Sequence, residues 1–363
     1  MNNNAVEKEK YMRALQMEGP GIVREVNVPI PEIADDEVLI RIAYSGICAT
    51  DYEILSGEMG LVKEGKIKYP VRFGHEYSGT VVKAGSAVKN FKPGDHVIGD
   101  AIITCGKCPA CLERRYEDCT TFNCVGTMYC WDGSFAEYMH LPERHLFKLP
   151  DSLSLMQCAL IEPSCVALEG LKRGGDLKDK TVAIIGTGAI GMTAVAMASH
   201  FKPAKIILVG RTEGKLAIGR KLGAQVLVNA RQEDALEAIL RETGGQGADF
   251  VLETSGNLEM VNKCVRALRY GGAVAYIGFY DNPADGFPID IVVSNKITVS
   301  GVMSGFGVPA EVIRILEEDK TDLTPIISHL ITMDEAPEAL LHPEKLPGDR
   351  IKIMVKICGE GDV

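Results

Sequence analysis

One segment, TVAIIGTGAIG at residues 181–191, sets the architecture of the second half of this 363-residue chain. Its first five residues form an uncharged run rich in β-branched side chains, which is typical of a buried strand, and a helical pattern follows. Gly186 allows a tight turn, Gly188 lets the backbone approach a pyrophosphate, and Gly191 lets the helix pack closely on the strand. The pattern therefore predicts a dinucleotide site formed by Gly186, Thr187, Gly188, Ala189, Ile190 and Gly191. The alternative is a tight turn that binds no ligand.

Strand and helix patterns alternate along the chain from this segment onward. The predicted strands are 181–185, 205–209, 225–228, 249–253, 273–278 and 298–302, and the predicted helices are 190–201, 215–222, 232–242 and 258–268. This alternation predicts an α/β fold with a doubly wound parallel sheet, a Rossmann domain, over residues 165–303. The uncharged stretch 181–199 is also about long enough to span a membrane, but the three glycines favour a strand, a turn and a helix.

The end of the second predicted strand indicates which dinucleotide binds. Sites for NAD usually carry an Asp or Glu there, which bonds the ribose 2′-hydroxyl. Here Gly210 stands at that position and Arg211, Thr212 and Lys215 follow. Since the acid is absent and arginine binds phosphate well, the sequence predicts NADP in preference to NAD. Glu213 keeps open the alternative that NAD binds and Arg211 is only a solvated surface residue.

Composition limits the classes of partner. Hydrophobic residues make up 46% of the chain and charged residues 24%, as in a soluble protein with about two domains. Asp and Glu outnumber Lys and Arg by 49 to 39, which argues against nucleic acid or an anionic membrane as a partner. The N-terminus, MNNNAVEKEK, has no apolar run. It is therefore predicted to be a short disordered tail and not a signal peptide, and the protein is predicted to be cytoplasmic.

The first half of the chain has a β-rich pattern and a cysteine cluster. Short strand patterns occur at 37–44, 79–83 and 96–103, and few helical patterns precede residue 153. Four of the eleven cysteines lie in the loop 104–120: Cys105, Cys108, Cys111 and Cys119. Four thiolates can close a shell around Zn²⁺ or hold an iron–sulfur cluster, and a closed zinc site is structural because it has no open position. The alternative is four free thiols in a loop.

Three separate short motifs carry further zinc-ligand types. Cys48 follows a predicted strand, His75 and Glu76 precede another, and Glu162 ends the β-rich half. Three protein ligands plus water define a catalytic zinc site. Each motif is weak evidence when taken alone, and their spacing does not bring them together.

The order of the motifs resembles that of the zinc-dependent medium-chain alcohol dehydrogenases. The resemblance covers about residues 12–357 and rests on GxCxxD at 46–51, GHE at 74–76, the four-cysteine loop, PGDHV at 93–97 and GTGAIG at 186–191. The pair Glu162-Pro163 resembles the branch of sorbitol and other polyol dehydrogenases, and also threonine dehydrogenase. The resemblance implies a GroES-like catalytic domain over residues 1–164 and a return of the chain to it over residues 304–363.

The resemblance also implies roles for individual residues. Cys48 and His75 would bind a catalytic Zn²⁺, with Glu76 or Glu162 as a third ligand directly or through water. Asp51 would orient His75, and Thr50 would begin a proton relay from the substrate hydroxyl. The family often has His where this chain has Glu53, so Glu53 or another route would complete the relay. With the four-cysteine loop this makes two zinc ions per chain, and the family implies a homo-oligomer, either a dimer or a tetramer.

Polar side chains near these motifs favour a polyhydroxylated substrate. The candidates are Thr50, Tyr52, Glu53, Glu162 and Glu169. We therefore expect hydride transfer between a polyol, sugar or cyclitol, or the corresponding ketone, and NADP. One alternative is an NAD-dependent L-threonine dehydrogenase. Another, of a different class, is a non-catalytic zinc- and dinucleotide-binding sensor or structural protein.

Overall fold

The computed structural model describes residues 10–278, 280 and 282–359, so the predicted N-terminal tail lies outside the described residues. The chain forms two compact units. The first unit contains the chain up to Glu162, then His329–Gly348, and the chain from Lys352 onward. The second unit contains Pro163–Ser328 and Asp349–Ile351.

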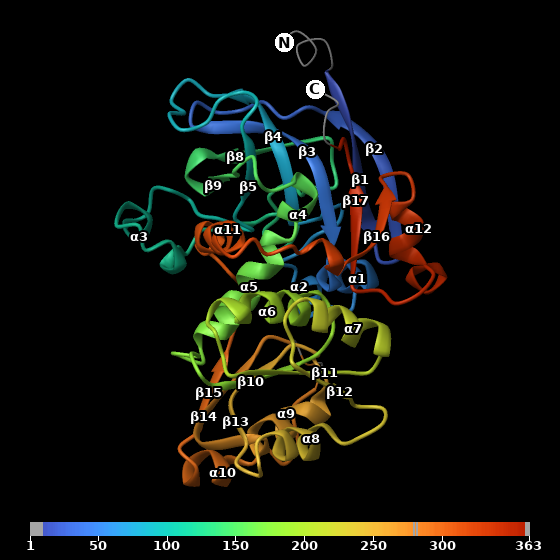
Figure 1. Ribbon diagram of the computed structural model, residues 1–363. Coiled ribbons are helices and arrows are strands. Elements are labelled where there is room, and N and C mark those ends of the chain that lie inside the picture. Colours follow the sequence, from blue (N-terminus) through green and yellow to red (C-terminus); the bar gives the residue numbers. More distant parts are fainter. Residues whose placement is uncertain (1–9, 279, 281, 360–363) are drawn as a thin grey trace. The chain divides into compact units, whose positions relative to one another are not determined.

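The second unit is built on a six-stranded parallel sheet. The strand order is β12-β11-β10-β13-β14-β15 (Figure 1). Successive strands are added on one side of β10 up to β12 and then on its other side from β13, so the strand order reverses between β10 and β13. The strands are β10 (Thr181–Ile185), β11 (Lys205–Gly210), β12 (Val226–Asn229), β13 (Ala248–Glu253), β14 (Leu268–Tyr276) and β15 (Thr298–Gly301). The doubly wound sheet predicted from the alternating pattern is confirmed.

Helices cover both faces of this sheet. The helices of the unit are α6 (Ala189–His200), α7 (Glu213–Lys221), α8 (Ala235–Glu242), α9 (Leu258–Arg266), α10 (Ile289–Ser294) and α11 (Pro309–Glu318). Ala183 and Ile207 pack in one buried cluster with residues of α8 and α9. On the opposite face Gly219 of α7 lies against the Leu208 side chain. Burial on both faces explains why the strands read as continuous apolar runs.

The first unit is built on a seven-stranded sheet of mainly antiparallel pairs. The order is β16-β17-β3-β4-β5-β9, and β8 also pairs with β3. The strands are β3 (Glu37–Ile47), β4 (Glu76–Ala84), β5 (His96–Gly99), β8 (Tyr138–Pro142), β9 (Leu146–Lys148), β16 (Ile327–Thr332) and β17 (Lys352–Lys356). Together with the parallel sheet of the second unit, this β-rich unit confirms the predicted fold class.

Smaller elements complete the first unit. A separate hairpin joins β1 (Tyr11–Gly19) to β2 (Ile22–Pro29), and β6 (Ile102–Ile103) pairs with β7 (Asn123–Cys124). The helices are α1 (Ala49–Ser56), α2 (Gly60–Lys63), α3 (Pro109–Leu112), α4 (Leu155–Cys158) and α12 (Ala336–Leu341), while α5 (Ile161–Lys172) continues into the second unit. The strand predicted at 96–103 is wrong as a single element, because it is interrupted where Asp100 N–H donates to His145 O at 2.9 Å.

The structural division differs from the predicted boundary at residue 304. Residues 304–328 belong to the second unit, and the chain returns to the first unit only at His329. Glu311 of α11 forms an ion pair with Lys172, and Gly305 packs on the backbone of Cys165, so this segment is anchored to the second unit. Among the described residues, no helix has the length and apolar character needed to cross a membrane.

Candidate functional site

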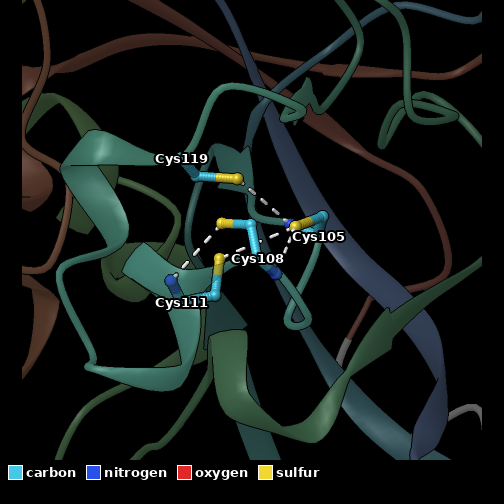
Figure 2. A group of neighbouring side chains, drawn as sticks. All are labelled: Cys105, Cys108, Cys111 and Cys119. Carbon is cyan, nitrogen blue, oxygen red and sulfur yellow. Dashed lines mark hydrogen bonds between the residues drawn. The ribbon is translucent and has the colours of Figure 1, made fainter.

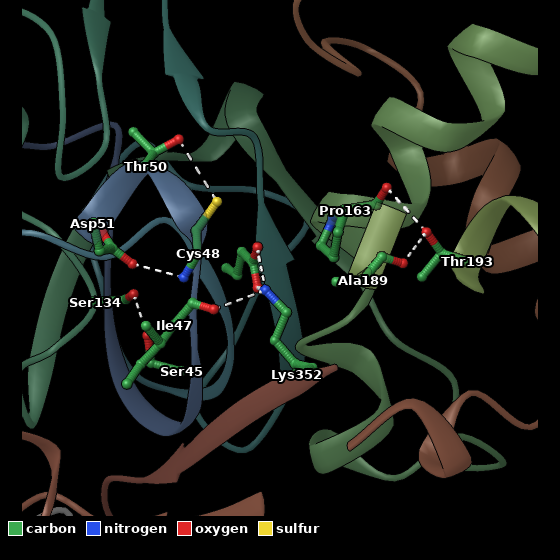
Figure 3. Close-up of polar contacts among 11 residues, drawn as sticks. Ser45, Ile47, Cys48, Thr50, Asp51, Ser134, Pro163, Ala189, Thr193 and Lys352 are labelled. Atoms are coloured by element: carbon green, nitrogen blue, oxygen red, sulfur yellow. Dashed lines mark hydrogen bonds and ion pairs between the residues drawn. The ribbon is translucent and has the colours of Figure 1, made fainter. Parts of the chain in front are cut away.

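Cys48 is held at the junction of strand β3 and helix α1. Its backbone is extended, and its N–H donates to Asp51 Oδ2 at 2.8 Å (Figure 3). A carboxylate three residues into a helix that accepts from the preceding N–H fixes the start of the helix. Asp51 therefore fixes the point at which the chain leaves the strand, and with it the position of the Cys48 backbone.

Three zinc-ligand types from separate motifs come together in the first unit. One side-chain atom each of Cys48, His75 and Glu76 lies within 4.8 Å of the other two. Glu76 begins β4 and is paired with Gly46 of β3, so the antiparallel register brings the two motifs together. His75 is 9% exposed and Glu76 is 1% exposed. Thr50 adds a hydroxyl, because its Oγ1 lies 3.7 Å from Cys48 Sγ.

A buried lysine completes this group, and the sequence analysis missed it. Lys352 Nζ donates to Ile47 O at 2.9 Å (Figure 3). It also donates to Glu76 Oε1 at 2.7 Å, and both charged side chains are almost fully buried. A side chain on Gly46 would collide with the Glu76 carboxylate, so glycine is needed there. Burial would lower the pKa of Lys352, but the Glu76 carboxylate raises it above its ordinary value. The only signal in the sequence was a lysine within an apolar strand.

Glu162, Asp51 and Glu53 lie outside the three-residue group. Burial raises the pKa of Glu162 to about 7 and that of Asp51 to about 6, while His75 opposes both shifts. Asp51 was expected to orient His75, but it is Cys48 N–H that bonds its Oδ2. Its Oδ1, like His75 Nδ1, is buried with no hydrogen-bond partner among the described residues. Glu53 is exposed on α1 and is not one of the three grouped residues.

The chemistry of the three-residue group fits Zn²⁺. A thiolate, an imidazole and a carboxylate are all zinc ligands, and three protein ligands leave a position for water or substrate. Burial would lower the pKa of His75, but the Cys48 thiolate and the Asp51 charge raise it well above its ordinary value. The imidazole therefore lies among negatively charged groups, and a bound dication would be stabilised by them.

The four-cysteine loop has the geometry of a tetrahedral metal site. All four sulfur atoms lie within 4.8 Å of one another, and Cys105 Sγ is 3.8 Å from Cys111 Sγ (Figure 2). Sulfur atoms about 2.3 Å from a tetrahedral Zn²⁺ lie about 3.8 Å apart, whereas a disulfide requires about 2 Å. An iron–sulfur cluster distributes its four thiolates over at least two iron atoms, so four sulfur atoms this close together favour a single Zn²⁺.

Backbone N–H groups prepare the Cys105 thiol to ionise, whereas hydrogen bonds from neighbouring cysteines help to raise the pKa of Cys108 to about 11. The N–H of Cys108 donates to Cys105 Sγ and that of Cys111 to Cys108 Sγ, each at 3.4 Å. Backbone N–H groups of Lys107 and Cys108 lower the pKa of Cys105 to about 6. Since zinc binds thiolates and not thiols, this arrangement favours binding.

A buried hydrogen-bond chain anchors the same loop. His145 Nε2 accepts from Thr104 N at 3.1 Å and lies 3.0 Å from Thr104 Oγ1. On its other side His145 Nδ1 lies 3.4 Å from Asp100 Oδ2. Because Nε2 accepts from a backbone N–H, the ring proton lies on Nδ1 and points to Asp100. Thr104 precedes the first cysteine, so this chain fixes the entry to the loop.

The glycine segment forms a cavity in the second unit. The cavity has a volume of about 360 Å³ and is lined by Gly186, Thr187, Gly188, Gly210, Arg211, Thr212 and Lys215 among others. Ala189, Ile190 and Gly191 begin α6 and are not among the lining residues. Gly186 has a φ of 115°, which a non-glycine residue rarely adopts. Sequence reasoning missed Thr254, Ser255, Asn257 and Met260, which line the cavity from the end of the neighbouring strand β13 onward.

The environment of Gly210 explains why the usual acid is absent. A Cβ at position 210 would collide with Thr187 Cγ2, so an acid there would require the Thr187 side chain to move. Glu213, which kept NAD open as an alternative, does not line the cavity, and its Oε1 accepts from Asn229 Nδ2 at 2.5 Å. The cavity therefore has basic side chains, Arg211 and Lys215, at the place where an acid would select NAD.

Comparison with protein families gives two matches. Residues 34–151 match the alcohol dehydrogenase GroES-like domain, and residues 189–318 match the zinc-binding dehydrogenase family.

Individual relatives cover nearly the whole chain. Sorbitol dehydrogenase of Bacillus subtilis is 30% identical over 344 residues, 95% of this chain and 97% of that protein. L-threonine 3-dehydrogenase of Bacillus velezensis is 34% identical over 310 residues, 85% of this chain and 88% of that protein. Among solved structures, a protein of Sinorhizobium meliloti described as a zinc-binding dehydrogenase and bound to NADP has a TM-score of 0.87. It is 31% identical, and the match covers 96% of this chain and 100% of that one.

Proposed function

The chain belongs to the zinc-dependent medium-chain alcohol dehydrogenases, in the branch of polyol and threonine dehydrogenases, and we propose that it oxidises a secondary alcohol of a polyol, sugar or cyclitol with NADP⁺. The observation that carries this proposal is the buried group of Cys48, His75 and Glu76, with the Thr50 hydroxyl beside it. Membership of an enzyme family, together with this group, favours catalysis over the non-catalytic sensor alternative.

We propose that Cys48, His75 and Glu76 hold the catalytic Zn²⁺ and that the four cysteines hold a second, structural one. When bound, a catalytic Zn²⁺ acts as a Lewis acid that lowers the pKa of a substrate alcohol. The Glu76 oxygen lies within the group, and Glu162 does not, which supports Glu76 as the third ligand. Lys352 donates a hydrogen bond to the Glu76 carboxylate, so the orientation of the carboxylate is set before a metal binds.

Thr50 is proposed to take the proton of the substrate hydroxyl. Its Oγ1 lies beside the Cys48 sulfur, and Thr50 is only partly buried, so it links the group to solvent. A hydroxyl both accepts and donates a hydrogen bond and can therefore pass a proton on. Since Glu53 is exposed and is not one of the three grouped residues, we propose that the relay continues through water.

The cavity of the second unit is proposed to prefer NADP⁺, which accepts the hydride in this class of reaction. The preference is supported by Gly210, which carries no acid, and by the basic residues Arg211 and Lys215. It is also supported by Glu213, whose carboxylate accepts a hydrogen bond from Asn229 and does not line the cavity. Arg211→Ala should weaken binding of NADP⁺ far more than binding of NAD⁺. Equal losses for the two dinucleotides would refute the assignment of Arg211 to the 2′-phosphate.

A second candidate is L-threonine 3-dehydrogenase activity. It is favoured by the Bacillus velezensis relative with that name, which is more identical in sequence (34%) than the sorbitol dehydrogenase (30%). The zinc group and the Glu162-Pro163 pair do not separate the two candidates, so the substrate must be measured directly.

The experiment is nicotinamide reduction against polyols, sugars, cyclitols, L-threonine and simple alcohols. NADP⁺ and NAD⁺ are compared side by side, with and without a zinc chelator. We expect chelator-sensitive turnover of a polyol, sugar or cyclitol with NADP⁺. Turnover of L-threonine with NAD⁺ would replace the first candidate by the second, and chelator-insensitive turnover would contradict the zinc assignment.

Two features of the assembly and setting are also proposed. We propose a homo-oligomer, because β15 pairs only with β14 in the described sheet and carries Val299 at 42% exposed, with Met303 nearby at 69%. Light scattering of the purified protein tests this, and a monomer would contradict it. We also propose a reducing, cytoplasmic setting, which is supported by the need of the four-cysteine site for reduced thiols.

A further inference from the structure

A short segment from the far end of the chain belongs to the dinucleotide-binding unit. Residues Asp349–Ile351 are part of the second unit, although His329–Gly348 and the chain from Lys352 onward belong to the first. Ile351 N–H donates to Ser328 Oγ at 2.9 Å. A Cβ on Gly214, at the start of α7, would lie 2.5 Å from Asp349 Oδ2. The segment is therefore seated directly against the helix that carries Lys215.

This contact gathers three cations around one edge of the cavity. Burial lowers the pKa of Lys215, the positive charges of Arg350 and Arg211 lower it further, and Asp349 opposes the shift. All three of these neighbours thus lie within electrostatic range of the Lys215 ammonium.

None of the three cations has an ion-pair partner within the described part of the chain. Among the described residues, Arg211, Lys215 and Arg350 form no ion pair and no side-chain hydrogen bond, although acidic residues outnumber basic ones in the chain. The hydroxyl of Thr212, which precedes α7, also makes no capping bond. Unpaired cations beside an unused hydroxyl, at the edge of a cavity, form a site for an anion with several acceptor oxygens.

The chemistry of a phosphate monoester matches this edge. At pH 7 such a phosphate carries a charge of about −1.5 to −2 and three acceptor oxygens. Arg211 and Lys215 line the cavity, whereas Arg350 is exposed and is not among the lining residues. Arg350 follows Asp349, which lies against Gly214 next to Lys215, and its charge acts on the Lys215 ammonium. Asp349 introduces a like charge, which weakens the attraction for a phosphate.

We propose that Arg350 is a third cation for the 2′-phosphate of NADP, and that Asp349 beside it limits how strongly the site selects NADP over NAD. The inference rests on the proposed NADP preference and extends it to residues that lie about 140 positions beyond Arg211 in the sequence. Selectivity is then set by the balance of three positive charges and one negative charge, because NAD has no group that interacts with any of them strongly.

The experiment measures dissociation constants for NADP⁺ and NAD⁺ by calorimetry on the full-length, zinc-loaded protein. Adenosine 2′,5′-bisphosphate and adenosine 5′-monophosphate are measured in parallel, because they report the 2′-phosphate without the nicotinamide half. The variants are Arg350→Gln, Asp349→Asn and, as a matched control, Arg266→Gln. Arg266 is an exposed arginine at the C-terminal end of α9, a helix that lines the cavity only near its N-terminus.

Arg350→Gln should weaken NADP⁺ and the bisphosphate by about tenfold, about 1.4 kcal/mol, and leave NAD⁺ and the monophosphate within about twofold. Asp349→Asn should tighten NADP⁺ by about threefold, or about 0.65 kcal/mol, and leave NAD⁺ unchanged. Arg266→Gln should change none of the four. The effects of Arg350→Gln and Asp349→Asn should shrink at high salt, since both act through charge.

Three results would overturn the inference. The first is an Arg350→Gln variant that binds NADP⁺ as the wild type does, or that loses NAD⁺ equally. The second is an Asp349→Asn variant that weakens NAD⁺, because Asp349 would then bind the ribose 2′-hydroxyl. The third is a wild type that prefers NAD⁺, in which case the proposed cofactor falls as well. If Arg211→Ala lowers the preference and Arg350→Gln does not, only the inference about Arg350 fails.

Discussion

Removing the Lys352 ammonium should destabilise the first unit strongly. Lys352→Met keeps a linear apolar side chain but leaves the Glu76 carboxylate buried without its cation. The two side chains are 3% and 2% exposed, and the lysine also donates to Ile47 O at 2.9 Å. Breaking one partner of a buried pair of this kind costs about 3–5 kcal/mol, because the remaining charge is left uncompensated. We expect a loss of that size in the free energy of unfolding.

The assay is urea unfolding followed by tryptophan fluorescence. Trp131 is the single tryptophan of the chain and lies in the first unit, so its signal reports that unit alone. Proteins are first dialysed against a chelator, since Zn²⁺ bound by Glu76 would partly replace the ammonium. The matched control is Lys148→Met, which breaks a pair of 2.7 Å with Asp95 in the same unit.

The control should show whether the loss of stability comes from the burial of the ion pair or from the loss of any ion pair. Lys148 is 55% exposed, so its loss should cost about 1 kcal/mol or less. Adding Glu76→Gln to Lys352→Met should recover part of the larger loss, because no unpaired charge then remains. Equal small losses for the two lysine variants would refute the reasoning that burial makes the Lys352–Glu76 pair costly to break.

Three further outcomes follow from the site geometry. The pKa of Lys215 is lowered, so the side chain loses its proton below the ordinary value of 10.5. The preference for NADP⁺ over NAD⁺ should therefore fall as pH rises towards that value, whereas Lys215→Arg should show a flat profile. His145→Ala should remove the acceptor of Thr104 N–H and the contact to Asp100, and speed zinc release to a chromogenic chelator by about 10- to 100-fold, while an unchanged rate would refute the anchoring role. Thr50→Val should lower kcat by about 10²-fold or more with unchanged NADP⁺ binding, and Thr50→Ser should restore it; a Val variant with normal kcat would remove Thr50 from the relay.

The fold of the second unit could be predicted because its strands are buried on both faces. Ile184 and Leu208 lie in uncharged runs that end at glycine turns. Such runs can be recognised as buried strands without knowledge of the neighbouring strands. The return of the chain at His329 could not be predicted, because α11 has an amphipathic pattern that suits either unit. Its assignment depends on the contact between Glu311 and Lys172, two residues far apart in sequence.

The candidate site was predictable by residue type but not by contact. Cys48, His75 and Glu76 were identified as ligand types, and the β3–β4 register that brings them together appears only in the structure. Lys352 and Arg350 were missed, since both come from the last strand and the segment before it. A charged residue in an apolar strand gives a local signal only that something must neutralise it, not which group does so.

Zinc content and turnover measured together on Cys48→Ser test the central claim most directly. We predict two zinc ions per wild-type chain, one for each candidate group. Cys48→Ser should lose one zinc ion and nearly all NADP⁺-dependent alcohol oxidation while it stays folded. Cys264→Ser, which alters a buried cysteine of α9 outside both groups, should keep both. A Cys48→Ser protein that retains full zinc content and turnover would contradict the assignment of the active site.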